Sequence, residues 1–196
     1  GGRSEAFAPG GWIGRRLRDR AKTVALLSKE HGIAKPVLFV HAGVVPAVAQ
    51  AAKAAAGPDA SAADIAEALN RIGRDALAGD ESVIRISDSP LLRDAGPFWT
   101  RELSLRSEAT ACQKLDEVLQ IFGAARMVVG HTPQEDGRIH TRCGGRLVLG
   151  DTLISAAYTG VAHPSALEVA SDGSMMAVYP KTGERSLLPL VPARNG

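Results

Sequence analysis

The sequence predicts a layered α/β domain that lies close to the border with the α+β class. Short apolar runs at residues 37–40 and 127–129 are typical of strands buried on both faces of a sheet. Segments with helical periodicity separate these runs, whereas the last third of the chain alternates in the manner of strands. Mixed helices and strands, followed by strands alone, favour a layered architecture.

The composition fits one globular domain. The 196 residues are 45% hydrophobic and 22% charged, which supplies a core and argues against intrinsic disorder. The net charge of +2 gives no support for a nucleic-acid partner. No apolar run approaches the roughly 20 residues that span a bilayer, so we expect no membrane partner either.

The two cysteines, Cys112 and Cys143, are too few for a disulfide framework. Their number indicates a reducing compartment, and we expect an intracellular protein of the cytoplasm or of an organelle. Cys112 lies on the apolar face of an expected helix, where a core thiol is the favoured interpretation. Neither cysteine belongs to a C-x-x-C pair, which excludes a zinc ribbon.

Apolar spacing predicts the first elements. Residues 12–30 carry apolar side chains at helical intervals, and Gly32 is a suitable end for that helix. A buried strand is expected at 37–40, and the Ala-rich residues 44–56 can be helical after Pro46.

A second helix is expected from Ser61 to about Leu77, because Ser61 is a natural N-cap with Asp64 three residues later. Residues 87–97 are rich in turn-forming residues and should form a loop. A further helix and several strands are then expected at residues 108–122, 127–129, 138–141, 146–149, 166–170 and 175–179, with a hairpin turn at Asp172-Gly173.

Two of the predicted strands end in a histidine beside a glycine, namely His41 and His131. Ligands collect at the carboxyl ends of parallel strands, and the nearby glycine allows close approach of backbone or ligand. Two neutral imidazoles at this edge could bind one metal ion. The alternative is a pair of unrelated histidines that hydrogen-bond to loops.

Arg101 follows a segment, residues 96–100, that contains proline and aromatic side chains. An arginine on such a stiff loop presents a planar fork that suits a phosphate group. The alternative is a surface arginine, or one paired with Glu102.

Other catalytic motifs are absent from the sequence. There is no G-x-x-x-x-G-K-[ST] phosphate loop and no G-x-S-x-G nucleophile elbow. The glycines of residues 10–14 do not follow a strand, so they are not a dinucleotide fingerprint. His41, Arg101 and His131 are therefore the candidate site residues.

Four segments, in order, resemble motifs of one enzyme family. Residues 38–46 resemble the VHGG(L/I)xP segment of calcineurin-like metallophosphoesterases of the phosphoprotein-phosphatase type, and residues 96–101 resemble their GPLWxR segment. Residues 128–137 resemble VGHTxxxxG, and residues 147–160 resemble xxIDTGxSxxYGG. The order and spacing are those of the Shewanella-like protein phosphatases, a branch also found in plants and algae.

The resemblance implies paired β-sheets flanked by helices and a binuclear centre of Mn, Fe or Zn ions. Such a centre polarises a phosphoryl group and activates water, so that phosphoproteins or small phosphoesters are hydrolysed. Residues at the positions of His41 and His131 would both ligate one ion, and Arg101 would clamp phosphate oxygens. Asp151 would organise the sheet edge rather than bind metal.

The chain departs from this family in its first half. The upstream motifs GDxHG, GDxxDRG and GNH, which supply the other ligands and the general acid, are absent. Residues 1–196 therefore resemble the C-terminal part of such a domain and offer two ligands, too few for a binuclear centre. Ala42 and Leu153 replace family glycines, and Ala157 stands where arginine is often found.

A domain of this family without its first half would lack strands of one sheet. We expect this to expose an apolar sheet edge and to make the isolated chain poorly soluble. The leading hypothesis is a fragment of a metal-dependent phosphatase located in the cytoplasm or an organelle, plastids included. A dinucleoside polyphosphate hydrolase of the same superfamily is the alternative enzyme. A non-catalytic remnant that serves as an interaction module is the alternative of another class.

Overall fold

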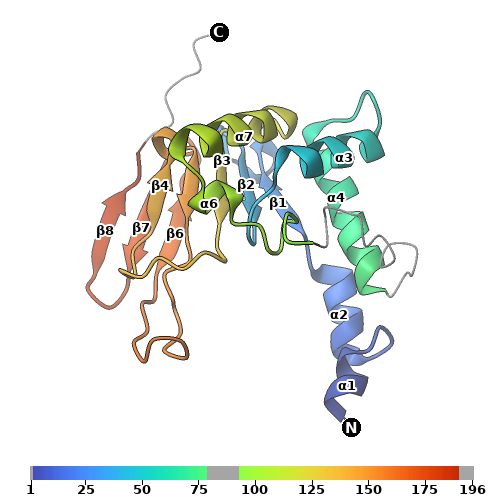
Figure 1. Cartoon of the computed structure of the whole chain (residues 1–196), viewed down its shortest axis with the longest axis horizontal. Coiled ribbons are helices and arrows are strands. Elements are labelled where there is room, and N and C mark those ends of the chain that lie inside the picture. The colour runs from blue at the N-terminus through green and yellow to red at the C-terminus, as the bar shows by residue number, and fades with distance from the viewer. Residues whose placement is uncertain (1, 79–92, 190–196) are drawn as a thin grey trace.

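The computed structural model describes residues 2–78 and 93–189, which form two β-sheets and a set of helices (Figure 1). The larger sheet has five strands in the order β1-β2-β3-β5-β4, and the smaller has three in the order β6-β7-β8. The strands are β1 Val24–Leu27, β2 Val37–Val40, β3 Arg126–Val129, β4 His140–Arg142, β5 Leu147–Leu149, β6 Ala166–Val169, β7 Met175–Tyr179 and β8 Glu184–Leu187. The helices are α1 Gly2–Phe7, α2 Trp12–Arg20, α3 Pro46–Ala56, α4 Ala62–Leu77, α6 Glu102–Leu105 and α7 Glu108–Ile121, with short 3₁₀ helices η1 Lys29–His31 and η2 Cys143–Gly145.

The centre of the larger sheet is parallel. Strand β2 pairs in parallel with β3, so that Val40 lies opposite Val129, and β3 pairs in parallel with β5. The outer strands β1 and β4 are antiparallel to their neighbours. The carboxyl ends of β2, β3 and β5 therefore meet at one edge of the sheet, which is where α/β folds bind ligands.

The two faces of the larger sheet bury different layers. Alternate strand residues such as Leu38 and Met127 pack against α3, α4 and α7, whereas Val37 and Val148 pack against the smaller sheet. In Figure 1, α7 crosses the larger sheet and the smaller sheet lies on the side away from α3 and α4. This arrangement confirms the predicted layered α/β class with its α+β character.

Most of the predicted elements are present. The strand at 37–40 and the helix that begins after Ser61 are confirmed. Ser61 Oγ accepts a hydrogen bond from the Asp64 backbone at 3.2 Å, and Asp64 Oδ2 accepts one from the Ser61 backbone at 2.9 Å. This reciprocal pair is a capping box that satisfies open donors at the helix start. Helix α7 matches the expected 108–122 to within one residue.

The long helix expected over residues 12–30 is wrong. Helix α2 ends at Arg20, Val24–Leu27 forms strand β1 opposite β2, and Gly32 ends the short helix η1 instead. The backbone N–H of Val24 donates to Asn70 Oδ1 at 2.9 Å, so tertiary contacts favour the strand. A four-residue apolar run is compatible with the periodicity of a helix and with that of a strand. In this protein, pairing with β2 selects the strand. Strand β8 was not predicted, and residues 87–92 of the expected loop lie outside the described residues.

The expectation that Cys112 is a core thiol is also wrong. Cys112 on α7 forms a disulfide with Cys143 at the start of η2, 31 residues away. The bond removes cysteine usage as a reason to favour a reducing compartment. None of the helices within the described residues is long and apolar enough to cross a membrane.

Leu115→Ala tests the packing of α7 on the larger sheet. Leu115 is 0% exposed in the helix-side core. Truncation leaves a cavity, so we expect the free energy of unfolding in urea to fall by about 2–5 kcal/mol. Gln113→Ala, at an exposed position of the same helix, should change it by less than about 0.5 kcal/mol. Equal losses in both variants would contradict this packing.

Candidate active site

The structure brings the three predicted site residues to one pocket. His41, Arg101 and His131 line a hollow of about 610 Å³ at the carboxyl edge of the larger sheet. Its remaining wall is largely apolar and aromatic, and consists of Phe98, Trp99, Pro133, Asp151, Leu153, Ile154, Ser155 and Tyr158. A concave, mostly apolar pocket with a few convergent polar groups is typical of a ligand site.

Strand register explains why the two histidines meet. Because Val40 lies opposite Val129, the residues that follow each strand emerge side by side. The backbone N–H of Gly130 donates to the His41 carbonyl at 2.8 Å, which extends the ladder past the strand ends. The two imidazole ring centroids are 4.9 Å apart. The histidines are therefore neighbours and not unrelated strand-end residues.

His131 is held in an unusual backbone conformation. Its φ is +63°, in the left-handed region that non-glycine residues rarely occupy at a cost of about 1–3 kcal/mol. The N–H of Thr132 donates to the Gly130 carbonyl at 2.7 Å, which closes a tight turn around His131. Trp99 meets the His131 ring edge-on, with centroids 5.4 Å apart. Such local strain at a pocket is a feature of functional sites.

The His131 ring presents a buried nitrogen without a partner. Nε2 is buried and forms no hydrogen bond with any other described residue. Burial, the positive charge of Arg101 and the adjacent His41 lower the pKa of His131, while hydrogen bonding to the Trp99 backbone and the Asp151 charge act against this. His131 is consequently neutral near pH 7, the state that a metal ligand requires.

Arg101 lies between the pocket and helix α6. The N–H of Thr100 donates to the Gly96 carbonyl at 2.9 Å, and that of Ala42 donates to the Pro97 carbonyl at 2.8 Å. These bonds fasten the loop before Arg101 to the end of β2. Glu102, the predicted alternative partner of Arg101, pairs with Lys114 of α7 instead. The guanidinium is exposed beside the histidines, as a phosphate clamp would have to be.

Asp151 follows β5 and completes the edge. Its carbonyl accepts from the Gln134 backbone at 2.7 Å, and its carboxylate accepts from the Leu153 backbone at 3.2 Å. These contacts agree with the predicted organising role, although Asp151 also lines the pocket. Leu153 has a φ of +57°, a left-handed conformation that glycine adopts freely, and the motif that residues 147–160 resemble has glycine at this position.

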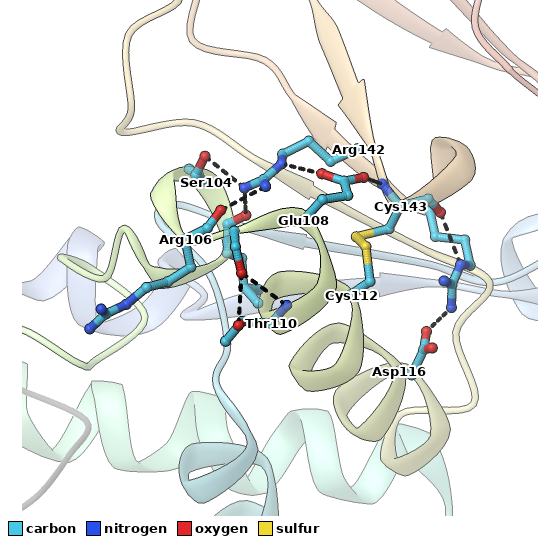
Figure 2. Close-up of a disulfide and its surroundings, with 11 residues drawn as sticks. Ser104, Arg106, Glu108, Thr110, Cys112, Asp116, Arg142 and Cys143 are labelled. Carbon is cyan, nitrogen blue, oxygen red and sulfur yellow. Dashed lines mark hydrogen bonds and ion pairs between the residues drawn. A yellow bond between two sulfur atoms is a disulfide. The ribbon is translucent and has the colours of Figure 1, made fainter.

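A second group of possible metal ligands lies away from the pocket. The ligand atoms of Glu108, Cys112 and Cys143 lie within 4.8 Å of one another. Both sulfurs belong to the disulfide, so neither is a thiolate that could bind metal in this state (Figure 2). Within residues 2–78 and 93–189, no cluster of three or more such ligands includes His41 or His131.

Two contacts do not follow from the sequence alone. The aromatic residues of 96–100 are expected only to stiffen the loop, whereas Trp99 contacts the His131 ring. The pairing of Cys112 with Cys143 has no local signature, since the two residues approach only through the fold. The family motif that contains Trp99 was the one available indication of its place.

Comparison with known proteins finds solved structures with the same fold and one relative that is similar in sequence over about half of the chain. The structure matches the cold-active protein tyrosine phosphatase of a psychrophilic Shewanella species with a TM-score of 0.67 and 20% identity, over 93% of this chain and 47% of that one. A mutant of a cold-active protein tyrosine phosphatase matches with a TM-score of 0.65 and 22% identity, over 90% and 45%. An uncharacterized protein of Schizosaccharomyces pombe is 38% identical over 98 residues, which are 48% of this chain and 29% of that protein. No protein-family model matches the chain.

The chain thus spans less than half the length of the solved structures that it resembles. At this level of identity the match establishes a shared fold, in agreement with the resemblance to Shewanella-like phosphatases. It does not establish a shared activity, since one fold carries many functions. Membership of the calcineurin-like superfamily and the extent of the whole domain stay predictions.

Arg101→Gln tests the electrostatics of the pocket. Because the guanidinium disfavours the protonated imidazole, its removal should raise the pKa of His131 toward that of an ordinary histidine. The pKa can be followed by NMR titration of the ring nitrogens. Arg185→Gln, on the smaller sheet, should leave it unchanged. A fall in the His131 pKa, or no change in Arg101→Gln, would contradict the geometry.

Proposed function

We propose that the chain is the part of a metal-dependent phosphatase in which His41 and His131 hold a divalent ion and Arg101 clamps the phosphate of a phosphoprotein. The observation that carries this proposal is the buried Nε2 of His131, which has no hydrogen-bond partner among the described residues and lies beside His41 and Arg101 in one pocket. A buried polar nitrogen is costly unless something pairs with it. A metal ion is the partner that best fits the neutral imidazole of His131 beside a second histidine ring, 4.9 Å away between centroids.

Of the ions that the family resemblance implies, the donor set suits zinc and iron better than manganese. Imidazole nitrogen is a common ligand of zinc and iron, whereas manganese prefers carboxylate oxygen. His41 and His131 supply only two nitrogens, and Asp151 is the acidic residue of the pocket wall. The residues described therefore fit one weakly held ion and leave positions open for water or substrate.

The protein groups can divide the work on a phosphoester among them. A bound ion would supply Lewis acidity toward a phosphoryl oxygen and a water of lowered pKa. Arg101 would donate two parallel hydrogen bonds to the phosphate oxygens and fix the orientation of the substrate. Exposed Trp99 and Tyr158 would contact the organic part of the phosphoester from the apolar wall.

The structural neighbours favour the same class of reaction. Both solved structures are named as protein tyrosine phosphatases, and their fold covers nearly all of this chain. Phosphorylated protein is therefore the substrate class that we propose.

Zinc titration of the isolated chain tests the ligand assignment. We expect His131→Ala and His41→Ala each to weaken zinc binding in calorimetry by at least the roughly 10- to 100-fold that follows loss of a hydrogen-bond partner of a metal ligand, since each removes one of the two ligands itself. His140→Ala is the matched control, because His140 is an exposed histidine on β4 that pairs with Asp136. Unchanged zinc affinity in His131→Ala would overturn the assignment.

Phosphate binding and turnover test the remaining roles. In the zinc-loaded chain, Arg101→Ala should raise the Kd of inorganic phosphate roughly 10- to 100-fold, as expected for charge-assisted hydrogen bonds. Hydrolysis of p-nitrophenyl phosphate by the chain alone should be slight, because the described pocket offers too few ligands for two ions. Substantial turnover that survives in His131→Ala would contradict the proposal.

A further inference from the structure

Arg142 holds the short helix α6 by its carboxyl end. Its Nη1 donates to the carbonyls of Leu103 at 2.7 Å and Ser104 at 2.8 Å, and its Nη2 donates to that of Arg106 at 2.7 Å (Figure 2). The last carbonyls of a helix lack hydrogen-bond partners within the helix. Here the Arg142 guanidinium binds three carbonyls at the end of α6, an arrangement that we call the Arg142 clasp. Arg142 belongs to β4, so this clasp ties the larger sheet to α6.

Two further bonds hold Arg142 and its neighbour in place. Arg142 Nε donates to Glu108 Oε2 at 2.9 Å, and the Cys143 backbone donates to Glu108 Oε1 at 2.6 Å. The Cys112–Cys143 disulfide joins the same two segments covalently. Hydrogen bonds from Cys143 and Arg142 to the carboxylate lower the pKa of Glu108, which keeps it charged. The start of α7 is thereby fastened to the end of β4.

The clasped helix begins at the pocket. Arg101 immediately precedes α6, and the N–H of Leu105 donates to the Arg101 carbonyl at 2.8 Å. Leu103 is buried in the core, and Glu102 pairs with Lys114 of α7. A displacement of α6 against β4 would therefore move the backbone that carries Arg101.

The backbone at Cys143 is constrained. Its φ is +55°, and Gly144 and Gly145 follow with φ of +65° and +88°. Glycine adopts this region freely, but cysteine does so only when its surroundings hold it there. The disulfide, the Glu108 hydrogen bond and the bond from Arg146 Nε to the Cys143 carbonyl at 3.0 Å all hold this conformation. Among these contacts the disulfide is the covalent one, so its loss would leave the turn held by hydrogen bonds and packing.

We propose that the Cys112–Cys143 disulfide is a redox-sensitive brace that, through the Arg142 clasp, sets the position of Arg101 in the pocket. This regulatory role rests on the proposed phosphate-binding function of Arg101. The oxidised brace holds the phosphate-binding arrangement, and the reduced form releases α6 and weakens it.

The redox step uses a dithiol as reductant. Its thiolate attacks Cys112 Sγ, which is the less buried of the two sulfur-bearing residues, and Cys143 leaves as a thiolate. The second thiol of the reductant then displaces Cys112 from the mixed disulfide. Two electrons and two protons pass to the cysteines, and the reductant becomes a disulfide.

Hydrogen exchange of the isolated chain, before and after dithiothreitol, is the direct test. We expect reduction to speed exchange of the amides of residues 101–108 by about tenfold, with the strands β2 and β3 little changed. Arg142→Ala should show the faster exchange even when oxidised. A Cys112→Ser/Cys143→Ser double variant should exchange like the reduced form, and dithiothreitol should not change its exchange rates. Arg185→Ala serves as the exposed-arginine control.

Phosphate binding supplies the functional readout. Inorganic phosphate is titrated into the zinc-loaded chain, and the thiols released by reduction are first blocked with iodoacetamide, because zinc would otherwise bind the free thiolates. We expect the phosphate Kd to rise several-fold on reduction, with no such response in Arg101→Ala. Equal affinity in both redox states, with weaker binding in Arg101→Ala, would overturn the brace and leave the proposed function standing.

Hydrogen exchange also separates the two proposals when phosphate does not bind to the chain. If phosphate binds neither redox form, the proposed function of Arg101 is wrong, and so is the regulatory inference that rests on it. Unchanged exchange at 101–108, or a uniform rise across the whole chain, would overturn the brace even where phosphate binds.

Discussion

The parallel pairing of β2 with β3 is the constraint on which the rest of the site depends. It places Val40 opposite Val129, so that His41 and His131 leave the sheet together, and the Gly130-to-His41 hydrogen bond of 2.8 Å extends this alignment. A slip of one residue would send alternate side chains to the other face and separate the two rings. Buried residues on both faces of these strands fix the register, because the helices and the smaller sheet each require their own set. The core thus positions the pocket.

The second level of organisation is the attachment of loops to that edge. The loop before Arg101 is hydrogen-bonded to the end of β2, and the segment after His131 is hydrogen-bonded to Asp151 beyond β5. Each loop alone would be free to move, since loops lie on the surface and carry few buried contacts. Fastening them to adjacent strand ends brings a guanidinium, two imidazoles and a carboxylate to one hollow. The strain at His131 is maintained by this same framework.

Local sequence predicted those features that local physics decides. The buried strand at 37–40, the capping box at Ser61 and the helix before Gly123 each follow from neighbouring residues. His41, Arg101 and His131 could be chosen because strand ends and stiff loops leave a recognisable pattern. Strand β1 could not be distinguished from helix, since its pairing with β2 and its bond to Asn70 are tertiary. The disulfide and the contact of Trp99 with His131 are hidden for the same reason: they join segments distant in sequence.

The central claim is that the paired strand ends create a metal-binding pocket. Crystals of the chain soaked with Zn2+ and measured on both sides of the zinc absorption edge test this most directly. The account predicts an anomalous difference peak in the pocket, within bonding distance of ring nitrogens of both His41 and His131. An empty pocket under saturating zinc, with any peak bound elsewhere on the chain, would contradict it.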